Sequence, residues 1–449
     1  MTTTTLPALR IGFIAIARTT FDMVLAAEIA QSARQHLQTI GEVIGRDTLV
    51  TDLSASGEAA DNLAHTPLDL LVILQATFAD STMVMRIAQG VDAPLLLWAV
   101  PEERSGGRLR LNSLCGVNLA AHALKRAGLR YYYAYAAPDD HAALHKAQSL
   151  AQAGRARRLL RDARIGRVGQ HPDGFETCIV NEYALARIGV EIHQIELAQV
   201  FDAMRSVSAE ATANQLQAVS ARVAGIAELD AAATHGTLSA YEALRCITQR
   251  ERLSGLAVRC WPEFFTEMGC AACGALSLLS DSHTPSSCEA DVNGTITQLI
   301  LQWLSGEPAF GADLVSVDAT SDTAVLWHCG QAPLAMADPD FQPRGALHSN
   351  RKLPLLLEFP LKPGRVTIAR LSEATGELRL VIGSGEMQRS ESLSFSGTSG
   401  VLRFDRPAAD VLDTILSEGL EHHLSLTYGD YTLPLRALAD MLEIPVLRL

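Results

Sequence analysis

Carboxylates and histidines recur between residues 260 and 333, each after a strand-like or turn-like segment. Glu289 lies in Cys-Glu-Ala-Asp-Val-Asn-Gly, Asp313 ends Phe-Gly-Ala-Asp, and His328 lies in Trp-His-Cys-Gly. Side chains at the carboxyl ends of strands in an open α/β sheet converge on one crevice, so these residues can share a site. Divalent ions such as Mn²⁺ and Mg²⁺ favour carboxylate oxygen, and an added imidazole shifts the preference toward Mn²⁺. Glu289, Asp313 and a histidine therefore form a candidate shell for a divalent metal.

Other interpretations of these residue types remain open. Spacing alone favours ordinary roles for each residue, as a helix cap, a turn aspartate or a satisfied core histidine. The segment Cys270-Ala-Ala-Cys273 supplies half of a zinc site, but no second Cys-x-x-Cys or nearby His-x-x-x-His completes four ligands. Structural cysteines are therefore favoured there. A Ser-His-Asp or Cys-His nucleophile is not ruled out, although the chain has no Gly-x-Ser-x-Gly elbow.

The first third of the chain alternates between apolar runs and Ala- and Leu-rich stretches. Continuous apolar runs are typical of strands buried on both faces, and helical segments between them indicate βαβ units with a parallel sheet. No Gly-x-Gly-x-x-Gly follows the first run and no Gly-x-x-x-x-Gly-Lys-[Ser/Thr] occurs, so this architecture does not predict a bound nucleotide. The expected strands are residues 11–16, 69–74, 94–100 and 131–135.

A second α/β region follows. Near Pro343 the sequence pattern changes to short stretches of alternating polar and apolar residues separated by glycine-containing turns, which predict a small β-barrel. The strands expected in this second region are residues 164–169, 190–195 and 255–260. The predicted fold class is α/β, with two Rossmann-like α/β domains followed by a small C-terminal β-barrel domain. The predicted domains are 1–165, 166–338 with the metal-site carboxylates, and 339–449 with a terminal helix and strand.

The bulk properties exclude several classes of protein. Of the 449 residues, 48% are apolar and 19% are charged, which is the balance of an ordinary folded protein. A net charge of −13 argues against nucleic acid as a partner, because neutralising phosphates needs a basic surface. The basic cluster from Arg155 to Arg167 is interpreted as a solvated linker helix. The sequence also predicts no membrane association, because no apolar stretch approaches the roughly 20 residues that span a bilayer.

The start of the chain and the cysteines indicate a cytoplasmic protein. Residues 1–7 have no basic region followed by a long apolar run, so we expect neither a signal peptide nor an anchor. Eight cysteines without an export signal indicate reduced thiols rather than a disulfide framework.

The candidate metal residues resemble those of a known enzyme family. Cys288-Glu-Ala-Asp, with Asp313 twenty-four positions after Glu289, resembles the metal-binding segments of L-fucose isomerases. The C-terminal Gly419-Leu-Glu-His-His423, followed by Leu438-Ala-Asp-Met-Leu-Glu-Ile-Pro-Val446, is similar to the segment that supplies the family's metal-binding histidine. By this resemblance His422 is that ligand. His328 resembles an additional metal-binding histidine of arabinose isomerases. The resemblance covers most of the chain, which is shorter than typical L-fucose isomerases and indicates a distinct branch of the L-fucose and L-arabinose isomerase superfamily.

This resemblance implies a metal-dependent aldose–ketose isomerase that works through a cis-enediol, with Mn²⁺ as the expected ion. Glu289 and Asp313 would be both the acid/base pair and metal ligands, with His422 and His328 completing the coordination. Trp261 and Glu263 are expected to contact sugar hydroxyls.

The resemblance also implies a homo-oligomer, either a hexamer or trimer-based. A neighbouring N-terminal domain would complete each active site, so Arg18 and Phe21 are expected to reach the sugar of another subunit. If the substrate carried an anionic group, Arg18 or Arg351 would be candidates to bind it.

Two alternatives to the isomerase remain at this stage. One is a non-catalytic sugar-binding or regulatory homologue with the same fold. The other is a metal-assisted epimerase or lyase that uses the same enediolate.

Overall fold

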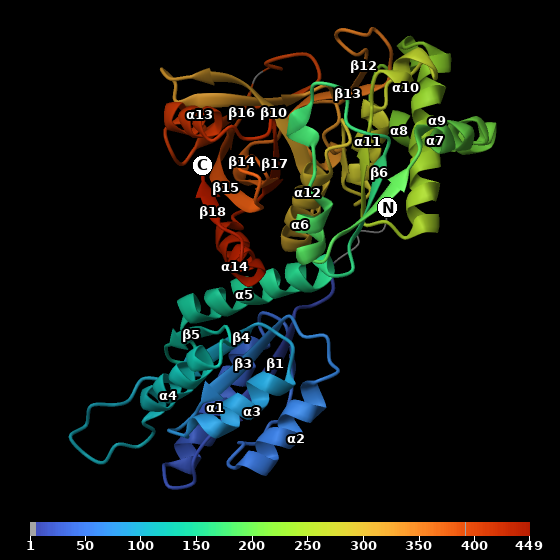
Figure 1. Cartoon of the computed structure of the whole chain (residues 1–449). Helices are drawn as coiled ribbons and strands as arrows, with labels where there is room; N and C mark the ends of the chain where they lie inside the picture. Colours follow the sequence, from blue (N-terminus) through green and yellow to red (C-terminus); the bar gives the residue numbers. More distant parts are fainter. Residues whose placement is uncertain (1–5, 391) are drawn as a thin grey trace. The chain divides into compact units, whose positions relative to one another are not determined.

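The computed structural model describes residues 6–390 and 392–449, which form two compact units (Figure 1). The first unit ends at Arg158, and the second comprises Leu159–Leu449. The sequence placed this first boundary at residue 165. Each unit has its own sheet and helices and is described by itself.

The first unit is a five-stranded parallel sheet with helices between its strands. The strand order β2-β1-β3-β4-β5 is that of flavodoxin-like doubly wound folds. Four strands confirm the predicted apolar runs, while the short, half-buried β2 was not predicted. The elements are β1 (Arg10–Ile16), α1 (Met23–Leu37), β2 (Glu42–Ile44), α2 (Leu53–Leu63), β3 (Leu70–Gln75), α3 (Ser81–Gly90), β4 (Leu95–Ala99), α4 (Ser113–Arg126), β5 (Tyr132–Tyr135) and α5 (His141–Leu160).

The basic cluster differs from its prediction as a solvated helix. α5 ends at Leu160, and Arg164–Val168 is a strand, β6. Arg155 is only 7% exposed, and its guanidinium lies 3.8 Å from the carboxylate of the buried Asp69. Arg158 binds the same carboxylate at 2.7 Å. A buried carboxylate needs a counterion, so these arginines are turned inward by Asp69 rather than toward solvent.

The second unit begins with a four-stranded parallel sheet in the order β7-β6-β8-β9. Its strands are β6, β7 (Glu191–Ile195), β8 (Gly255–Val258) and β9 (Ser286–Ser287). The first three confirm the expected strands, and the short β9 was not expected. The helices are α6 (Glu182–Arg187), α7 (Leu197–Arg205), α8 (Ala209–Ser220), α9 (Ala231–Glu251), α10 (Glu263–Thr266), α11 (Cys273–Asp281) and α12 (Val292–Ser305).

A six-stranded β-barrel follows in the same unit. The strands pair in the order β16-β11-β10-β17-β14-β15, and β15 pairs again with β16 to close the barrel. The predicted barrel is therefore confirmed, and two of its strands, β10 and β11, precede residue 339. The elements are β10 (Phe310–Asp318), β11 (Thr323–His328), β12 (Arg344–Ala346), β13 (Leu356–Pro360), β14 (Gly364–Ser372), β15 (Arg379–Gln388), β16 (Thr398–Phe404), α13 (Ala408–Ser417), β17 (His423–Tyr428), α14 (Thr432–Leu442) and β18 (Val446–Arg448).

Helix α12 joins the parallel sheet to the barrel. It contacts β8 and β9 on one side and β10, β14 and β17 on the other, and nearly all of its residues are buried (Figure 1). The helix Val-Asn-Gly-Thr-Ile-Thr-Gln-Leu-Ile-Leu-Gln-Trp-Leu has no charged residue, and buried polar side chains such as Thr295 and Thr297 form hydrogen bonds, so the helix can be buried on all sides. One continuous core runs from Val168 in β6 to Leu426 in β17. The sheet and the barrel are thus one packed body, which fixes the N-terminus of α12 between them.

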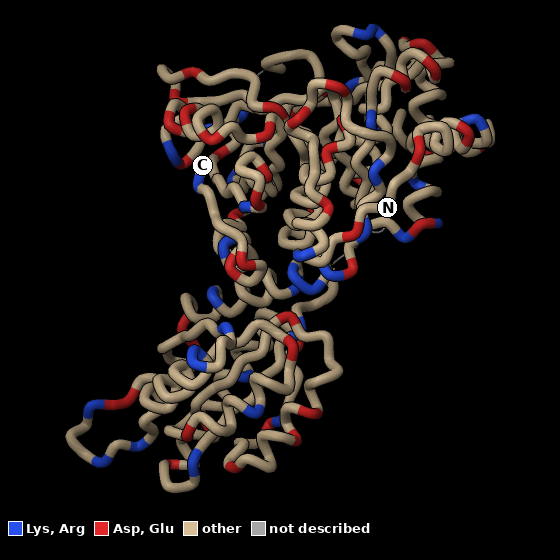
Figure 2. The backbone as a smooth tube through the Cα atoms, in the orientation of Figure 1, with Lys and Arg blue, Asp and Glu red and all other residues tan. Residues whose placement is uncertain are grey.

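Charged residues of both signs are intermixed along the part of the chain that the structure describes (Figure 2). No helix among the described residues has the length and apolarity that crossing a bilayer requires.

Candidate active site

A strained turn at the start of α12 presents Glu289. The turn Cys288–Asp291 connects β9 to α12, and both Glu289 and Ala290 adopt left-handed backbone conformations, with φ of 58° and 55°. Such φ values are unfavourable for residues with a Cβ, at a cost of about 1–3 kcal/mol each, and cluster at functional sites. The conformation therefore indicates that the position of the Glu289 carboxylate is held by its surroundings.

Asp313 and His423 face each other across two barrel strands. They are directly paired residues of the antiparallel strands β10 and β17. Directly paired residues place their side chains on the same face, with Cβ atoms about 4.5–5.5 Å apart. His423 Nε2 lies 3.6 Å from Asp313 Oδ1 and 3.9 Å from Glu289 Oε2. The barrel thus supplies a carboxylate and an imidazole to the carboxylate of the α12 turn.

Asp291 fixes the orientation of the His423 ring through the ring nitrogen Nδ1. Asp291 caps α12 by accepting a hydrogen bond from Gly294 N–H at 2.9 Å, and His423 Nδ1–H donates to its carboxylate at 2.9 Å. Arg370 in β14 binds both oxygens of Asp291, at 2.6 and 3.0 Å, and both side chains are 1% exposed. Because Nδ1 carries the proton, a neutral His423 has its lone pair on Nε2, which lies 3.6 Å from Cys288 Sγ and also near Asp313 and Glu289.

Gly294 allows this arrangement. A Cβ at this position would lie 2.3 Å from Asp291 Oδ2 and 3.1 Å from the Arg370 guanidinium. The glycine of Cys-Glu-Ala-Asp-Val-Asn-Gly therefore makes room for the ion pair behind His423.

Glu289 is held by two further side chains. Trp261 Nε1–H donates to Oε1 at 3.1 Å, and His422 Nε2 lies 2.9 Å from Oε2. His422 Nδ1 lies 2.7 Å from Thr177 Oγ1, and its ring packs edge-on against Phe175 at 5.9 Å. The two adjacent histidines therefore both reach Glu289, but only His423 also faces Asp313 among the ion pairs of the described residues.

The two carboxylates have opposite pKa shifts. Burial raises the pKa of Asp313 despite the opposing effect of His423 and His422. Burial also acts to raise the pKa of Glu289, but the hydrogen bond with His422, the charge of His423 and the hydrogen bond from Trp261 outweigh it and lower that pKa. Two neighbouring carboxyl groups with separated pKa values are the usual basis for assigning one acid and one base.

The electrostatics also fit a cation between the groups. Asp313 Oδ1 is buried and accepts no hydrogen bond among the described residues. A buried, unsatisfied carboxylate oxygen is costly unless a charge partner completes it. Together with Glu289 and Nε2 of His423, it forms a carboxylate and imidazole donor set of the kind that suits Mn²⁺.

His328 borders a group of thiols in the same cavity. The Cys329 backbone N–H donates to its Nδ1 at 2.8 Å, so a neutral His328 carries its proton on Nε2, which lies 3.1 Å from Cys288 Sγ. Burial lowers the pKa of His328 well below its ordinary value and keeps the ring neutral. Cys329 Sγ in turn lies 3.2 Å from Cys273 Sγ, and both cysteines are free thiols.

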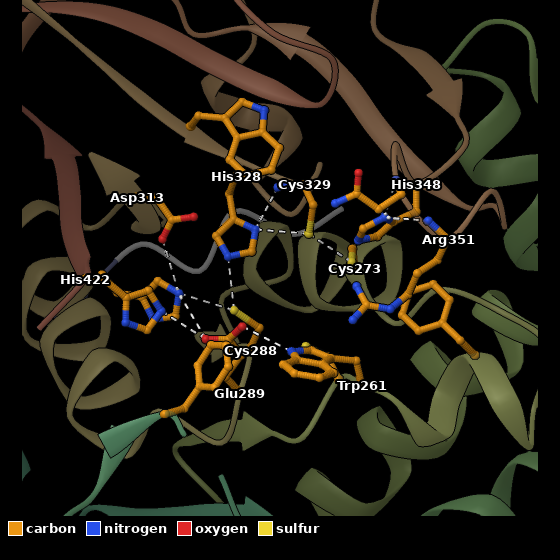
Figure 3. Close-up of a pocket in the computed structure, with 16 residues that line it drawn as sticks. Trp261, Cys273, Cys288, Glu289, Asp313, His328, Cys329, His348, Arg351 and His422 are labelled. Atoms are coloured by element: carbon orange, nitrogen blue, oxygen red, sulfur yellow. Dashed lines mark hydrogen bonds and ion pairs between the residues drawn. The ribbon is translucent and has the colours of Figure 1, made fainter. Parts of the chain in front are cut away.

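These side chains line a cavity of about 250 Å³ (Figure 3). It brings together six of the candidate site residues predicted from the sequence, namely Trp261, Glu289, Asp313, His328, Arg351 and His422. Glu263 is absent from the lining and instead forms an ion pair with Arg259 at 2.8 Å.

Arg18 and Phe21 belong to the first unit. There Arg18 lies 3.8 Å from Asp80, and Phe21 packs against Phe78 at 6.0 Å. Their expected contact with a sugar stays a prediction.

Sequence reasoning missed His423, Asp291 and Arg370. The sequence contains the pair His422-His423 but not its strand register, and only the register shows which ring faces Asp313. Asp291 was visible two positions after Glu289 and carries a helix-cap signal, since it directly precedes the apolar run of α12. Arg370 lies seventy-nine positions after Asp291, and no local pattern in the sequence connects the two residues.

The chain resembles known proteins over nearly its full length. Residues 12–160 match the family described as fucose/sulfoquinovose isomerase, N-terminal domain, and residues 326–449 match L-fucose isomerase, C-terminal domain. The sulfoquinovose isomerase of Priestia aryabhattai is 31% identical over 436 residues, covering 96% of this chain and 97% of the relative. That of Alkalicoccus urumqiensis is 30% identical over 446 residues, covering 98% and 99%. That of Clostridium sp. (strain MSTE9) is 33% identical over 380 residues, covering 84% and 85%.

Proposed function

Since this chain belongs to the L-fucose isomerase-like family of sugar isomerases, as its motifs predicted, we propose that it is a metal-dependent aldose–ketose isomerase whose substrate is sulfoquinovose. The observation that carries this proposal is the buried, unsatisfied Asp313 carboxylate, which faces His423 beside Glu289 in the cavity. The proposed identity of the substrate comes from the relatives named above, which are sulfoquinovose isomerases.

The proposed metal ligands are Glu289, Asp313 and His423. His423 Nε2 lies 3.6 Å from the Asp313 carboxylate and 3.9 Å from that of Glu289, and ligand atoms of Glu289, His422 and His423 lie within 4.8 Å of one another. Ligating histidines almost always donate their other ring N–H to a carboxylate or carbonyl, and His423 donates to Asp291. The sequence predicted His422 as the ligand, whereas this proposal assigns that role to the neighbouring His423. The reason is that Nδ1 of His422 forms a hydrogen bond with Thr177 and not with a carboxylate. The assignment of His328 as an additional ligand stays a prediction.

In the proposed reaction a proton moves between C2 and C1 of the open-chain sugar while another moves between O1 and O2. A bound divalent ion would hold O1 and O2 and stabilise the negative charge that develops on oxygen. Glu289 and Asp313 would exchange these protons with the sugar, Glu289 at carbon and Asp313 at oxygen. Trp261 and His422 orient the Glu289 carboxylate.

Finer expectations belong to the same proposal. Mn²⁺ is the expected ion, and the enzyme is expected to be a cytoplasmic homo-oligomer, hexameric or trimer-based. Two Rossmann-like domains, with a boundary at residue 338 before the barrel domain, likewise stay predictions.

The test is to follow sulfoquinovose by NMR in D₂O with metal-stripped protein, with and without Mn²⁺. The proposal predicts conversion to the corresponding 2-ketose only with Mn²⁺, accompanied by deuterium at the carbon that receives the proton. The deuterium is expected because an acid/base pair exchanges protons with solvent.

Three results would contradict this proposal. An aldose with inverted C2 would identify an epimerase, and a product that has lost water would identify a lyase. Saturable binding of the sugar without turnover, in protein that binds Mn²⁺, would identify a non-catalytic sugar-binding homologue.

A further inference from the structure

The geometry points to Arg351 as the anion-binding residue of the cavity, which receives a sulfonate or another tetrahedral oxyanion on the sugar carbon farthest from the carbonyl. This inference rests on the proposed function and adds to it a specificity-determining residue. Arg351 is part of the cavity lining that also contains Glu289 and Asp313.

The guanidinium of Arg351 is held between two aromatic rings. Its Cζ lies 4.8 Å from the ring centre of Trp261 and 5.0 Å from that of Phe265. Stacking on ring faces orients a guanidinium while leaving the N–H donors at its edge available. Arg351 is therefore pre-oriented for a ligand in the cavity, and less ordering entropy is lost when an anion binds.

The backbone around Arg351 is also fixed. His348 Nδ1 accepts hydrogen bonds from the backbone N–H groups of Asn350 and Arg351, at 3.3 and 3.4 Å. Two backbone bonds between His348 and Leu353 or Lys352, at 2.9 and 2.8 Å, close the turn. The turn between β12 and β13 thus presents Arg351 from a defined position.

Arg351 has no carboxylate within ion-pairing distance among the residues that the structure describes. By contrast, Arg259 and Arg370 beside the site are paired with Glu263 and Asp291. A half-buried arginine that is stacked but not paired has all its charge available to a ligand. A guanidinium binds a sulfonate or phosphate through two parallel N–H···O bonds.

The position of Arg351 determines which end of the sugar carries the anion. Figure 3 shows Arg351 and His348 on one side of the cavity and Asp313 and His422 on the other. The reacting C1 and C2 belong at the carboxylates, so the far carbon of a hexose extends toward Arg351. The carboxylates and the proposed ion engage the carbonyl end of the sugar, whereas the unpaired Arg351 can neutralise an anion at the other end. Trp261 connects the two ends, since it donates to Glu289 and stacks under Arg351.

The experiment compares wild type with Arg351→Gln and Arg351→Lys on three sugars that share one skeleton: sulfoquinovose, glucose 6-phosphate and neutral 6-deoxyglucose. We expect Arg351→Gln to lower kcat/KM for sulfoquinovose by about 10–100-fold, the range expected for losing a hydrogen-bonded charge, and to change that for 6-deoxyglucose less than about threefold. Arg351→Lys is expected to recover part of the loss, because lysine keeps the positive charge but cannot form the two parallel N–H···O bonds of a guanidinium. A loss on phosphate but not on sulfonate would assign Arg351 to sugar phosphates instead and overturn the sulfonate assignment.

Arg205→Gln is the matched control, because Arg205 is exposed, paired with Asp202 and outside the cavity lining. Arg205→Gln should leave kcat/KM for all three sugars unchanged. An equal loss on the neutral and anionic sugars in Arg351→Gln would overturn the inference, since it would show that Arg351 only supports Trp261.

Binding to Mn²⁺-loaded protein by calorimetry separates this inference from the proposed function. If wild type turns over no sugar, the proposed function fails. A preference for sulfoquinovose over 6-deoxyglucose that disappears in Arg351→Gln would still support the anion site. A preference that persists in the variant would refute it.

Discussion

His422 and His423 are adjacent in sequence but differ in what they can coordinate. Both rings reach Glu289, and their centres are 3.9 Å apart. His423 is buried, bonded to Asp291 and opposite Asp313, whereas the side chain of His422 is 35% exposed and bonded to Thr177. This difference supports the proposal that His423 coordinates the ion and that His422 orients the Glu289 carboxylate.

Substituting each histidine by glutamine tests that assignment. His423→Gln is expected to weaken Mn²⁺ binding by at least about 100-fold, the upper end of the range for losing even an outer-shell partner. His422→Gln is expected to keep Mn²⁺ affinity within about tenfold and to lower turnover instead, because Glu289 loses its orientation. Calorimetric Mn²⁺ titration and kcat measured on both variants check this, with circular dichroism as the folding control. Loss of Mn²⁺ binding in His422→Gln alone would reverse the assignment.

At this scale the sequence predicted the types of the site residues better than their roles. Glu289 and Asp313 were found because their segments resemble those of a known family. The choice between two neighbouring histidines depends on strand register, and the support from Arg370 depends on a contact seventy-nine positions away. Neither is encoded in local spacing.

At the scale of elements, α12 is the piece that organises the site. It lies between the parallel sheet and the barrel, and its N-terminal cap, Asp291, is also the partner of His423 and Arg370. Capping the helix and orienting His423, the proposed metal ligand, are thus done by one carboxylate. A change that displaces Asp291 should affect stability and metal binding together.

Gly294→Ala tests this link. The new methyl group would lie 2.3 Å from Asp291 Oδ2, so the carboxylate must move away from His423. We expect a loss of about 1–3 kcal/mol in the free energy of unfolding from overpacking and a 10–100-fold loss of Mn²⁺ affinity from the displaced partner.

Gly57→Ala is the control for this substitution. Gly57 is also helical, in α2, but its Cβ would meet only the flexible end of Arg86, at 3.3 Å. It is expected to leave Mn²⁺ binding unchanged. Unchanged stability and metal affinity in Gly294→Ala would show that Asp291 does not couple the cap to the site.

The elements themselves were largely predictable. Strands β1, β3 and β4 are buried on both faces and appear as continuous apolar runs, and these three and the more exposed β5 lie within one residue of the expected positions at every end. β10 was not expected as a barrel strand, because its burial is continuous only over Phe310–Ala312 and weakens afterwards. The inward turn of Arg155 and Arg158 was also not predictable, since it depends on the distant Asp69.

At the scale of the whole molecule, the described cavity is built entirely from residues of the second unit. The family was predictable because its metal segments occur in the expected order, and the full-length relatives confirm it. The number of subunits, and the contact of Arg18 and Phe21 with a neighbouring site, depend on surfaces that a single chain does not define. They stay predictions.

We propose that Glu289, Asp313 and His423 hold a divalent ion that isomerisation requires. The most direct measurement is an EPR titration of Mn²⁺ into metal-stripped wild type, Glu289→Gln and Asp313→Asn, with sulfoquinovose isomerisation followed in the same samples. We predict one tight Mn²⁺ site per wild-type chain, activity that rises in proportion to its occupancy, and loss of both in the two folded variants. Undiminished Mn²⁺ binding in the variants, or full activity of the metal-stripped wild type, would contradict the account.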